Sequence, residues 1–176
     1  MHYCPDVVWG DLQTADYVRA MLRIVADFTG SPAAAEDIEA GVALRTARIQ
    51  HLGDEGRAAH VLLGEQALYT NIGGSAVMSA QLHRLRETTE LDGLRFGVVP
   101  RSAPSRGVFP GPGFGLFDRA EVLIEGFAGE FRLTDAESVA VHLRAFAALE
   151  RTAVYGGAAR GLLGQAERHW RTSEHL

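Results

Sequence analysis

Apolar residues recur at helical spacing in the first third of the chain, and this pattern predicts two amphipathic helices. In residues 14–28 the apolar positions lie three or four residues apart, and Gly30 follows as a C-terminal cap. A Ser-Pro pair then predicts the start of a second helix over residues 31–51. Arg45 falls on the apolar side of this second helix.

Short apolar or alternating runs in the rest of the chain predict strands. The run His60–Leu63 has the composition of a buried strand, and a third helix begins near Ser75. Glycine, proline and charged turns separate the later runs, of which the last two are close enough to form a hairpin. These later runs are Leu94–Val99, Phe114–Phe117, Val122–Phe127 and Glu130–Leu133.

The C-terminal quarter predicts two more helices. Thr134–Glu137 has the pattern of a capping box and starts a helix that reaches about Ala153. Two glycines at 156–157 separate it from a final helix that ends near Trp170. We therefore expect an α+β fold, in which five or so helices pack on a small mixed sheet of about five short strands without a regular βαβ repeat. Residues 1–176 are expected to form a single domain.

Composition and charge restrict the classes of function. A chain of 176 residues with 47% hydrophobic residues suits one soluble domain with a hydrophobic core. The net charge is -5 and basic residues do not cluster, so we expect no direct contact with nucleic acid. Apolar runs are far shorter than the ~20 residues that cross a bilayer, so we expect no membrane partner. All basic residues are arginines, which excludes a Schiff-base or P-loop lysine.

Cysteine and histidine usage indicates neither disulfides nor a metal centre. The single cysteine, Cys4, lies near an N-terminus expected to be flexible, and a reducing cytoplasm is the natural location. Of the seven histidines only His60 precedes a buried strand, and no pair has metal-ligand spacing. We found no serine elbow, cysteine-histidine dyad or dinucleotide fingerprint, so we expect no cofactor.

Several motifs, in the same order along the chain, resemble one family. Residues 7–20 are similar to the pattern "PGLLQT-x-x-YARA", and Arg45–Arg48 to "R-x-x-R-Q". Val61–Gly74 resembles "VVLDEAALRRPVGG", and Leu123–Phe127 resembles "VYVEGLAG". On these residues the chain resembles the uncharacterised C-terminal domain of actinobacterial, antitoxin-like helix-turn-helix regulators of the XRE type. The likeness covers about Trp9 to Leu163.

The resemblance implies a fold and a regulatory context. In that family a DNA-binding helix-turn-helix module comes first, and here we expect it to be absent, so that function lies in the remaining domain. Gly64 stands where the family has aspartate, Tyr69 where it has arginine, and Asp11 where an apolar residue is usual. The loss of a positive charge at Tyr69 favours a less anionic and more hydrophobic ligand, although drift at an exposed position would give the same change.

Glu65 and Tyr69 are the predicted catalytic residues. Glu65 follows an apolar strand directly, and a carboxylate at the end of a sheet suits acid or base work. Tyr69 would polarise a carbonyl group or help to move a proton. The alternative for Glu65 is an ion pair with Arg45 or Arg48, because an arginine on an apolar helix face needs a carboxylate if it is buried.

Six further residues are predicted to bind the ligand. Trp9 and Asp11 could close over a pocket, although a tryptophan near a terminus often only attaches the chain to the core. The long Pro/Gly-rich stretch 101–113 is either a lid that carries Phe109 or a surface excursion. Glu125 either faces Glu65 across the sheet or is an exposed edge carboxylate. The full set is Trp9, Asp11, Arg45, His60, Phe109 and Glu125.

Two functions of different classes remain open. In the first, a regulator's effector domain has been repurposed in specialised metabolism and binds a small, largely apolar metabolite, which it cyclises or isomerises without a cofactor. In the second, the domain is a stand-alone regulatory sensor or an antitoxin-like protein-interaction domain without catalysis. A regulator whose N-terminal module is missing from this sequence ranks below both. A homodimer is compatible with either main hypothesis.

Overall fold

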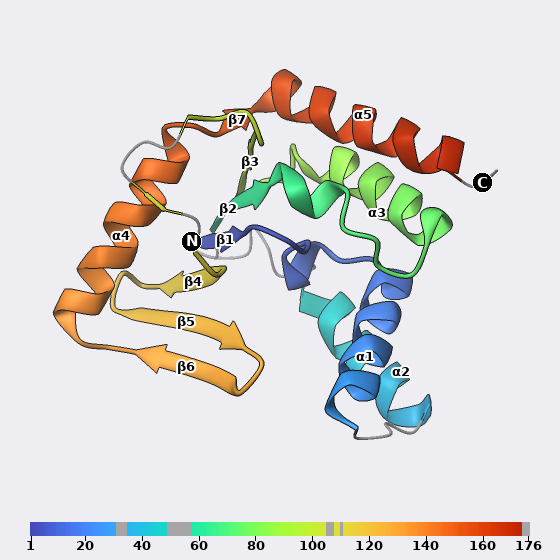
Figure 1. The fold of residues 1–176 in the computed structure, drawn as a ribbon, viewed down its shortest axis with the longest axis horizontal. Helices are drawn as coiled ribbons and strands as arrows, with labels where there is room; N and C mark the ends of the chain where they lie inside the picture. Colours follow the sequence, from blue (N-terminus) through green and yellow to red (C-terminus); the bar gives the residue numbers. More distant parts are fainter. Residues whose placement is uncertain (31–34, 49–57, 105–107, 110, 174–176) are drawn as a thin grey trace.

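The computed structural model describes residues 1–30, 35–48, 58–104, 108–109 and 111–173 (Figure 1). Within these residues five α-helices pack on a mixed sheet of seven strands, which confirms the α+β class. The helices are α1 (Ala15–Thr29), α2 (Ala35–Arg48), α3 (Ser75–Thr88), α4 (Ala136–Glu150) and α5 (Gly156–Ser173). The strands are β1 (His2–Cys4), β2 (Ala59–Gly64), β3 (Leu94–Val99), β4 (Phe114–Phe117), β5 (Glu121–Gly126), β6 (Gly129–Leu133) and β7 (Val154–Tyr155). The described residues also form the short 3-10 helices η1 (Gly10–Leu12) and η3 (Glu65–Leu68).

The strand order in the sheet is β6-β5-β4-β1-β2-β3-β7. β1, β2 and β3 run parallel, because helices carry the chain back after β1 and again after β2. β4 pairs antiparallel with the other side of β1, and β5 and β6 follow as antiparallel neighbours. β7 adds to the far side of β3 in the antiparallel direction. A parallel block and an antiparallel block therefore meet at β1.

The prediction of about five strands missed β1 and β7. Strands of three and two residues carry no periodicity, and their pairing is decided by contacts distant in the sequence. Because β1 was missed, the expectation of no βαβ repeat was also wrong, since β1, β2 and β3 form two successive parallel crossovers. Cys4 does not lie in a flexible end but in β1, where burial raises the pKa of its thiol to about 12.

Helices cover both faces of the sheet, and the side chains of β2 alternate between two cores. Val61 and Leu63 lie in the core formed with α3 and α5, to which η1 and α1 also contribute. Leu62 lies on the opposite face, in the core with Phe146 and Leu149 of α4. Figure 1 shows α4 apart from α3 and α5, as expected for helices on opposite faces. The predicted β2 is confirmed as a central strand buried on both sides.

The two N-terminal helices agree with the hydrophobic pattern over the part of the chain that is described. Thr14 is the N-cap of α1, and Gly30 ends the helix in the left-handed conformation with a φ of 63°. The predicted start and end of the second helix, at residues 31–34 and 49–51, lie outside the described residues. Between them, α2 packs against α1.

α4 differs from its prediction at both ends. Its N-cap is Asp135 instead of Thr134, and the Asp135 carboxylate accepts a hydrogen bond of 2.8 Å from the backbone N–H of Ser138. The helix ends at Glu150 instead of continuing to Ala153. The strand pairing between β7 and β3 takes the place of the last helical turn, because it requires an extended backbone directly after Ala153.

Buried hydrogen bonds hold the N-terminal motif against α3. Gln81 of α3 is fully buried; its Nε2 donates to the carbonyl of Leu12 at 2.9 Å, and its Oε1 accepts from the N–H of Thr14 at 2.7 Å. The Tyr17 hydroxyl accepts from the N–H of Val8 at 3.3 Å. These residues belong to the segment that carried the family resemblance, so this segment is structural in this fold.

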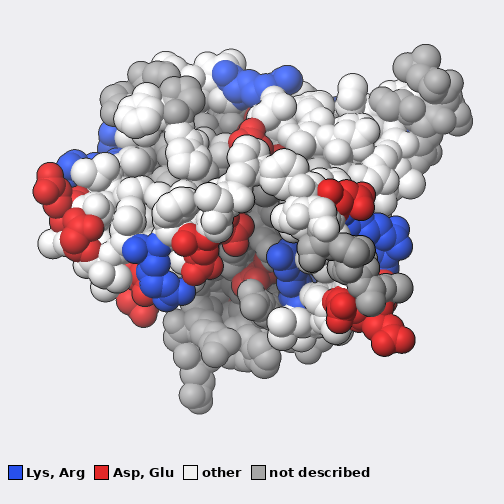
Figure 2. All heavy atoms as spheres, turned by 60° about the horizontal axis from the view of Figure 1, so that its bottom comes forward, with Lys and Arg blue, Asp and Glu red and all other residues white. Residues whose placement is uncertain are grey.

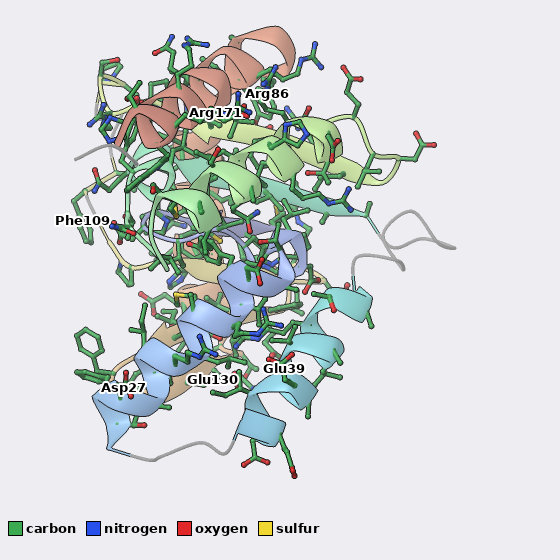
Figure 3. The ribbon with its side chains drawn as sticks, turned by 90° about the vertical axis from the view of Figure 1, so that its right-hand side faces the viewer. Asp27, Glu39, Arg86, Phe109, Glu130 and Arg171 are labelled. Carbon is green, nitrogen blue, oxygen red and sulfur yellow. The ribbon has the colours of Figure 1, made fainter. Side chains whose placement is uncertain are left out.

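Helices α3 and α5 are joined through one buried carboxylate. Glu167 of α5, whose side chain is 4% exposed, accepts from Arg86 of α3 at 2.8 Å and from Arg171 at 2.6 Å. Figure 3 shows Arg86 and Arg171 close together where the two helices meet. Burial alone would raise the pKa of Glu167, but the hydrogen bond from Arg86 and the charge of Arg171 outweigh burial and lower it.

Replacing Gln81 by alanine is expected to destabilise the fold by about 2–4 kcal/mol, because the Thr14 N–H and the Leu12 carbonyl each lose a buried partner. Urea unfolding followed by circular dichroism measures this loss. Gln165→Ala on the exposed side of α5 is the matched control, expected to change stability by less than about 0.5 kcal/mol. Equal effects of the two changes would contradict the role of Gln81.

The free energy of unfolding is expected to decrease as the pH is lowered and Glu167 becomes protonated. A carboxyl group whose folded pKa lies below its ordinary value of 4.5 stabilises the fold above that pH, and this contribution is lost as the pH falls through the folded pKa. The melting temperature of Glu167→Gln should therefore decrease less between pH 5 and pH 3 (roughly the range of carboxylate titration) than that of the parent. Asp92→Asn, in an exposed turn, should retain the parent's slope. If the melting temperatures of the parent and Glu167→Gln decrease equally between these pH values, Glu167 does not contribute to the pH dependence of stability.

Candidate functional site

A pocket opens at the carboxyl ends of the three parallel strands. It has a volume of about 380 Å³ and reaches the ends of β2 and β3 at Gly64 and Val99, and Pro5 just after β1. The N-terminal residue of β4, Phe114, lies at the same edge because β4 runs antiparallel to β1. The carboxyl edge of parallel strands is a frequent place for ligands in sheets of this kind.

The walls of the pocket are mostly apolar. Helix α4 crosses one side with Val141, Ala145 and Leu149, and the segment after β3 supplies several prolines and Phe109. Phe109 is 83% exposed, and Figure 3 shows it at the margin of the molecule. The apolar lining comprises Pro5, Val99, Pro100, Ala103, Pro104, Val108, Phe109, Pro112, Phe114, Val141, Ala145 and Leu149.

Gly64 lets the chain after β1 approach β2 closely. A Cβ atom at this position would lie 2.5 Å from the carbonyl oxygen of Pro5 and 2.9 Å from its Cα. Both atoms belong to the backbone, so a side chain could not be accommodated by a rotamer change. The close approach places Pro5 and Asp6 in the lining of the pocket.

Three aromatic rings form a row along the pocket. The ring centroids of Tyr3 and Phe114 are 5.9 Å apart, and those of Phe114 and His142 are 5.0 Å apart. Nδ1 of His142 donates to the carbonyl of Ser138 at 2.8 Å, since a carbonyl oxygen can only accept. A neutral His142 therefore has Nε2 as its hydrogen-bond acceptor. Burial raises the pKa of Tyr3, with a smaller contribution from the charge of Asp6, so its hydroxyl stays a donor at neutral pH.

Glu65 lines the pocket and is held by Arg101. Its Oε2 accepts a hydrogen bond of 2.8 Å from the backbone N–H of Arg101, and its Oε1 lies 3.5 Å from Nε of the same residue. The Arg101 guanidinium also lies over the ring of Tyr69, 4.7 Å from its centroid. Trp170 holds the segment between Glu65 and Tyr69 in place, because its indole N–H donates to the carbonyl of Leu68 at 2.8 Å.

The structure brings Glu65 and Phe109 together at the pocket, but not the other predicted site residues. Tyr69 contacts Arg101 and His169 and is not among the described residues that line the pocket. Trp9 stacks on His2 with a centroid distance of 4.5 Å, and it packs against the core to which α3 and α5 contribute. Asp11 lies in η1, also outside the lining.

Three predicted residues lie on other elements. Arg45 is on α2, and the partner of Glu65 in the described residues is Arg101 instead of Arg45. His60 is near the start of β2, at the opposite end from the pocket, where its Nε2 lies 3.0 Å from the hydroxyl of Tyr155. Glu125 is exposed and pairs in register with Glu130 in the β5-β6 hairpin.

Sequence reasoning missed His142 and Tyr3. The sequence analysis selected only His60 among the histidines, but His142 lies one residue after Val141 and three before Ala145, and all three line the pocket. Helical spacing from apolar positions in α4 could have placed it on that face. Tyr3 lies on β1, which no pattern predicted.

In the described part of the chain, His, Cys, Asp and Glu side chains form no group of three or more that could hold a metal ion. None of the helices there is both long enough and apolar enough to span a bilayer.

A comparison with protein families matches residues 1–165 to the family described as "Domain of unknown function (DUF5753)". Neither the curated proteins nor the solved structures gave a match.

Glu65 is expected to control the ordering of the backbone at Arg101. In Glu65→Ala the Arg101 amide proton should exchange with solvent roughly 10- to 100-fold faster, because a hydrogen bond to a charged acceptor worth about 1.5–3 kcal/mol is lost. Glu65→Gln keeps a side-chain acceptor, so exchange of the Arg101 amide should increase less than in Glu65→Ala. Amide exchange measured by NMR checks this, with the Ala120 amide, bonded to the carbonyl of Phe117 in the turn between β4 and β5, as the internal control. Unchanged exchange at Arg101 in Glu65→Ala would refute the hydrogen bond.

Proposed function

The chain belongs to the DUF5753 family, and we propose that it binds a small, largely apolar molecule in the pocket at the carboxyl ends of β1, β2 and β3. The observation that carries this proposal is the pocket itself. Its volume of about 380 Å³ falls within the range of roughly 300–1,000 Å³ typical of ligand sites. Apolar walls with a few convergent polar groups are also typical of such sites.

The polar groups support acid-base chemistry on the bound molecule. His142 can accept a proton at Nε2, and the protonated Tyr3 hydroxyl can donate a hydrogen bond to a carbonyl oxygen. We propose that His142 removes a proton beside such a carbonyl and returns it elsewhere on the same molecule. This transfer conserves all atoms and needs no cofactor, as in an isomerisation or a ring closure. The pocket contributes by holding a flexible substrate in a reactive conformation.

Glu65 is better suited to positioning than to proton transfer, because Arg101 already occupies both of its oxygens. It orders the start of the segment that carries Phe109 over the pocket. Tyr69 acts through Arg101 and does not contact the bound molecule. A role in specialised metabolism fits an apolar ligand of this kind.

A second candidate function is a regulatory sensor without turnover. Its support is the resemblance to the C-terminal domain of XRE-type regulators, together with the position of Arg101. Arg101 contacts Glu65 at the pocket and Tyr69 on its other side, and Tyr69 contacts His169 of α5. A ligand that displaced Arg101 would change the packing of α5, which a partner protein could detect.

Two probes separate binding from catalysis. Nile red, whose fluorescence rises in apolar surroundings, should bind the parent and bind Ala145→Trp at least about tenfold more weakly, because the larger side chain fills the pocket. Ring opening of a benzisoxazole, started by removal of one proton, should be roughly 100-fold slower in His142→Gln while dye binding is kept. Arg144→Trp, on the exposed side of α4, is the control and should match the parent in both assays.

If the parent binds the dye but His142→Gln opens the benzisoxazole ring as fast as the parent, the results would favour the sensor over the enzyme. Equal dye binding by the parent and Ala145→Trp would exclude this pocket as the binding site.

A further inference from the structure

Strand β6 forms an open edge of the sheet. It ends the strand order, with β5 as its neighbour on one side, and Figure 1 shows no described element beyond it at the lower edge of the molecule. Residues 129–132 are exposed, and the side chain of Phe131 is 52% exposed. Free backbone groups on such an edge can pair with another strand.

The hairpin geometry determines which backbone groups face outward. Gly126 and Gly129 pair across a turn of two residues, and pairs that exchange hydrogen bonds alternate along an antiparallel ladder with pairs that do not. Counting from the turn, Phe131 bonds inward to Ile124. The N–H and C=O groups of Glu130 and Arg132 therefore point to the open edge.

We propose that β6 pairs with β6 of a second copy of this chain, antiparallel and centred on Phe131. A twofold axis at this residue places Glu130 opposite Arg132 of the partner subunit, and Arg132 opposite Glu130 of the partner subunit. Glu130 and Arg132 carry the outward backbone groups, so these two pairs can exchange hydrogen bonds. The seven-stranded sheets of the two copies then form one continuous sheet.

Side-chain charge and apolar surface agree with this register. Two opposite-charge pairs face each other across the axis, and cross-strand pairs of this type are favourable. Arg132 already contacts Glu121 at 2.7 Å and Glu130 at 3.2 Å, but 59% of its side chain stays exposed and available. At the axis the two Phe131 residues form a pair without mutual backbone bonds, in which side chains lie closest. Burying both rings removes apolar surface from water.

The surface around this edge has no single sign of charge that would repel a second copy. Figure 2 turns the lower side of Figure 1 forward and shows arginine and acidic side chains interspersed there. The sheet edge also lacks proline and lysine, which commonly protect open edges. The described residues of β5 and β6 do not line the pocket, whose nearest strand is β4 with Phe114, so both copies keep it open.

Charge reversals test the register directly. The parent should form a dimer in sedimentation velocity, and Glu130→Arg or Arg132→Glu alone should weaken it at least about tenfold, because each change creates two like-charge pairs. An equimolar mixture of the two variants should dimerise again, since every facing pair is then opposite in charge. Arg168→Glu on the exposed side of α5 is the control and should dimerise like the parent.

Circular dichroism and Nile red binding should remain those of the parent in every variant, which separates this test from the pocket's function. Rescue in the mixture is specific, since a misfolded variant could not regain a partner. A parent that stays monomeric overturns the proposal. It is equally overturned if single reversals leave the dimer intact, or if the mixture fails to restore it.

Discussion

The pairing of β1 on both of its sides is the constraint on which the rest of this structure depends. All three of its residues, His2–Cys4, pair with β2 on one side, and His2 and Tyr3 also pair with β4 on the other. Without β1 the parallel and antiparallel blocks would have no common strand, and Tyr3 and Phe114 would not meet at the pocket. Such a short strand contributes few backbone bonds, so its position relies on side-chain packing and on the chain that follows it.

That following chain contains the most recognisable motif in the sequence. Leu12, Thr14 and Tyr17 are part of the segment that resembles the family pattern, and each of them takes part in a hydrogen bond in the structure. Gln81 satisfies the backbone on both sides of the turn between η1 and α1. The motif therefore explains how the first strand is held beside the second, and it contributes no side chain to the pocket.

Much of the fold could be predicted from local pattern, whereas only part of the candidate site could. α1, β2 and the β5-β6 hairpin follow from periodicity and turn residues, which act over a few neighbours. Glu65 and Phe109 were found because a strand end and a long Pro/Gly-rich segment are local signals. His142 and Tyr3 were missed because their meeting depends on β1 pairing and on α4 crossing the sheet. His60 and Glu125 were assigned to the site, but His60 lies near the opposite end of β2 and Glu125 lies in the β5-β6 hairpin, outside the pocket lining.

Gly64 shows how one residue can act beyond its own position. The backbone of Pro5 occupies the space that the first carbon of any side chain at position 64 would need. A chain with a side chain at this position must route the segment after β1 differently, and its cavity would lack the wall that Pro5 and Asp6 provide here. The shape of the cavity is therefore tied to a single glycine at the end of β2.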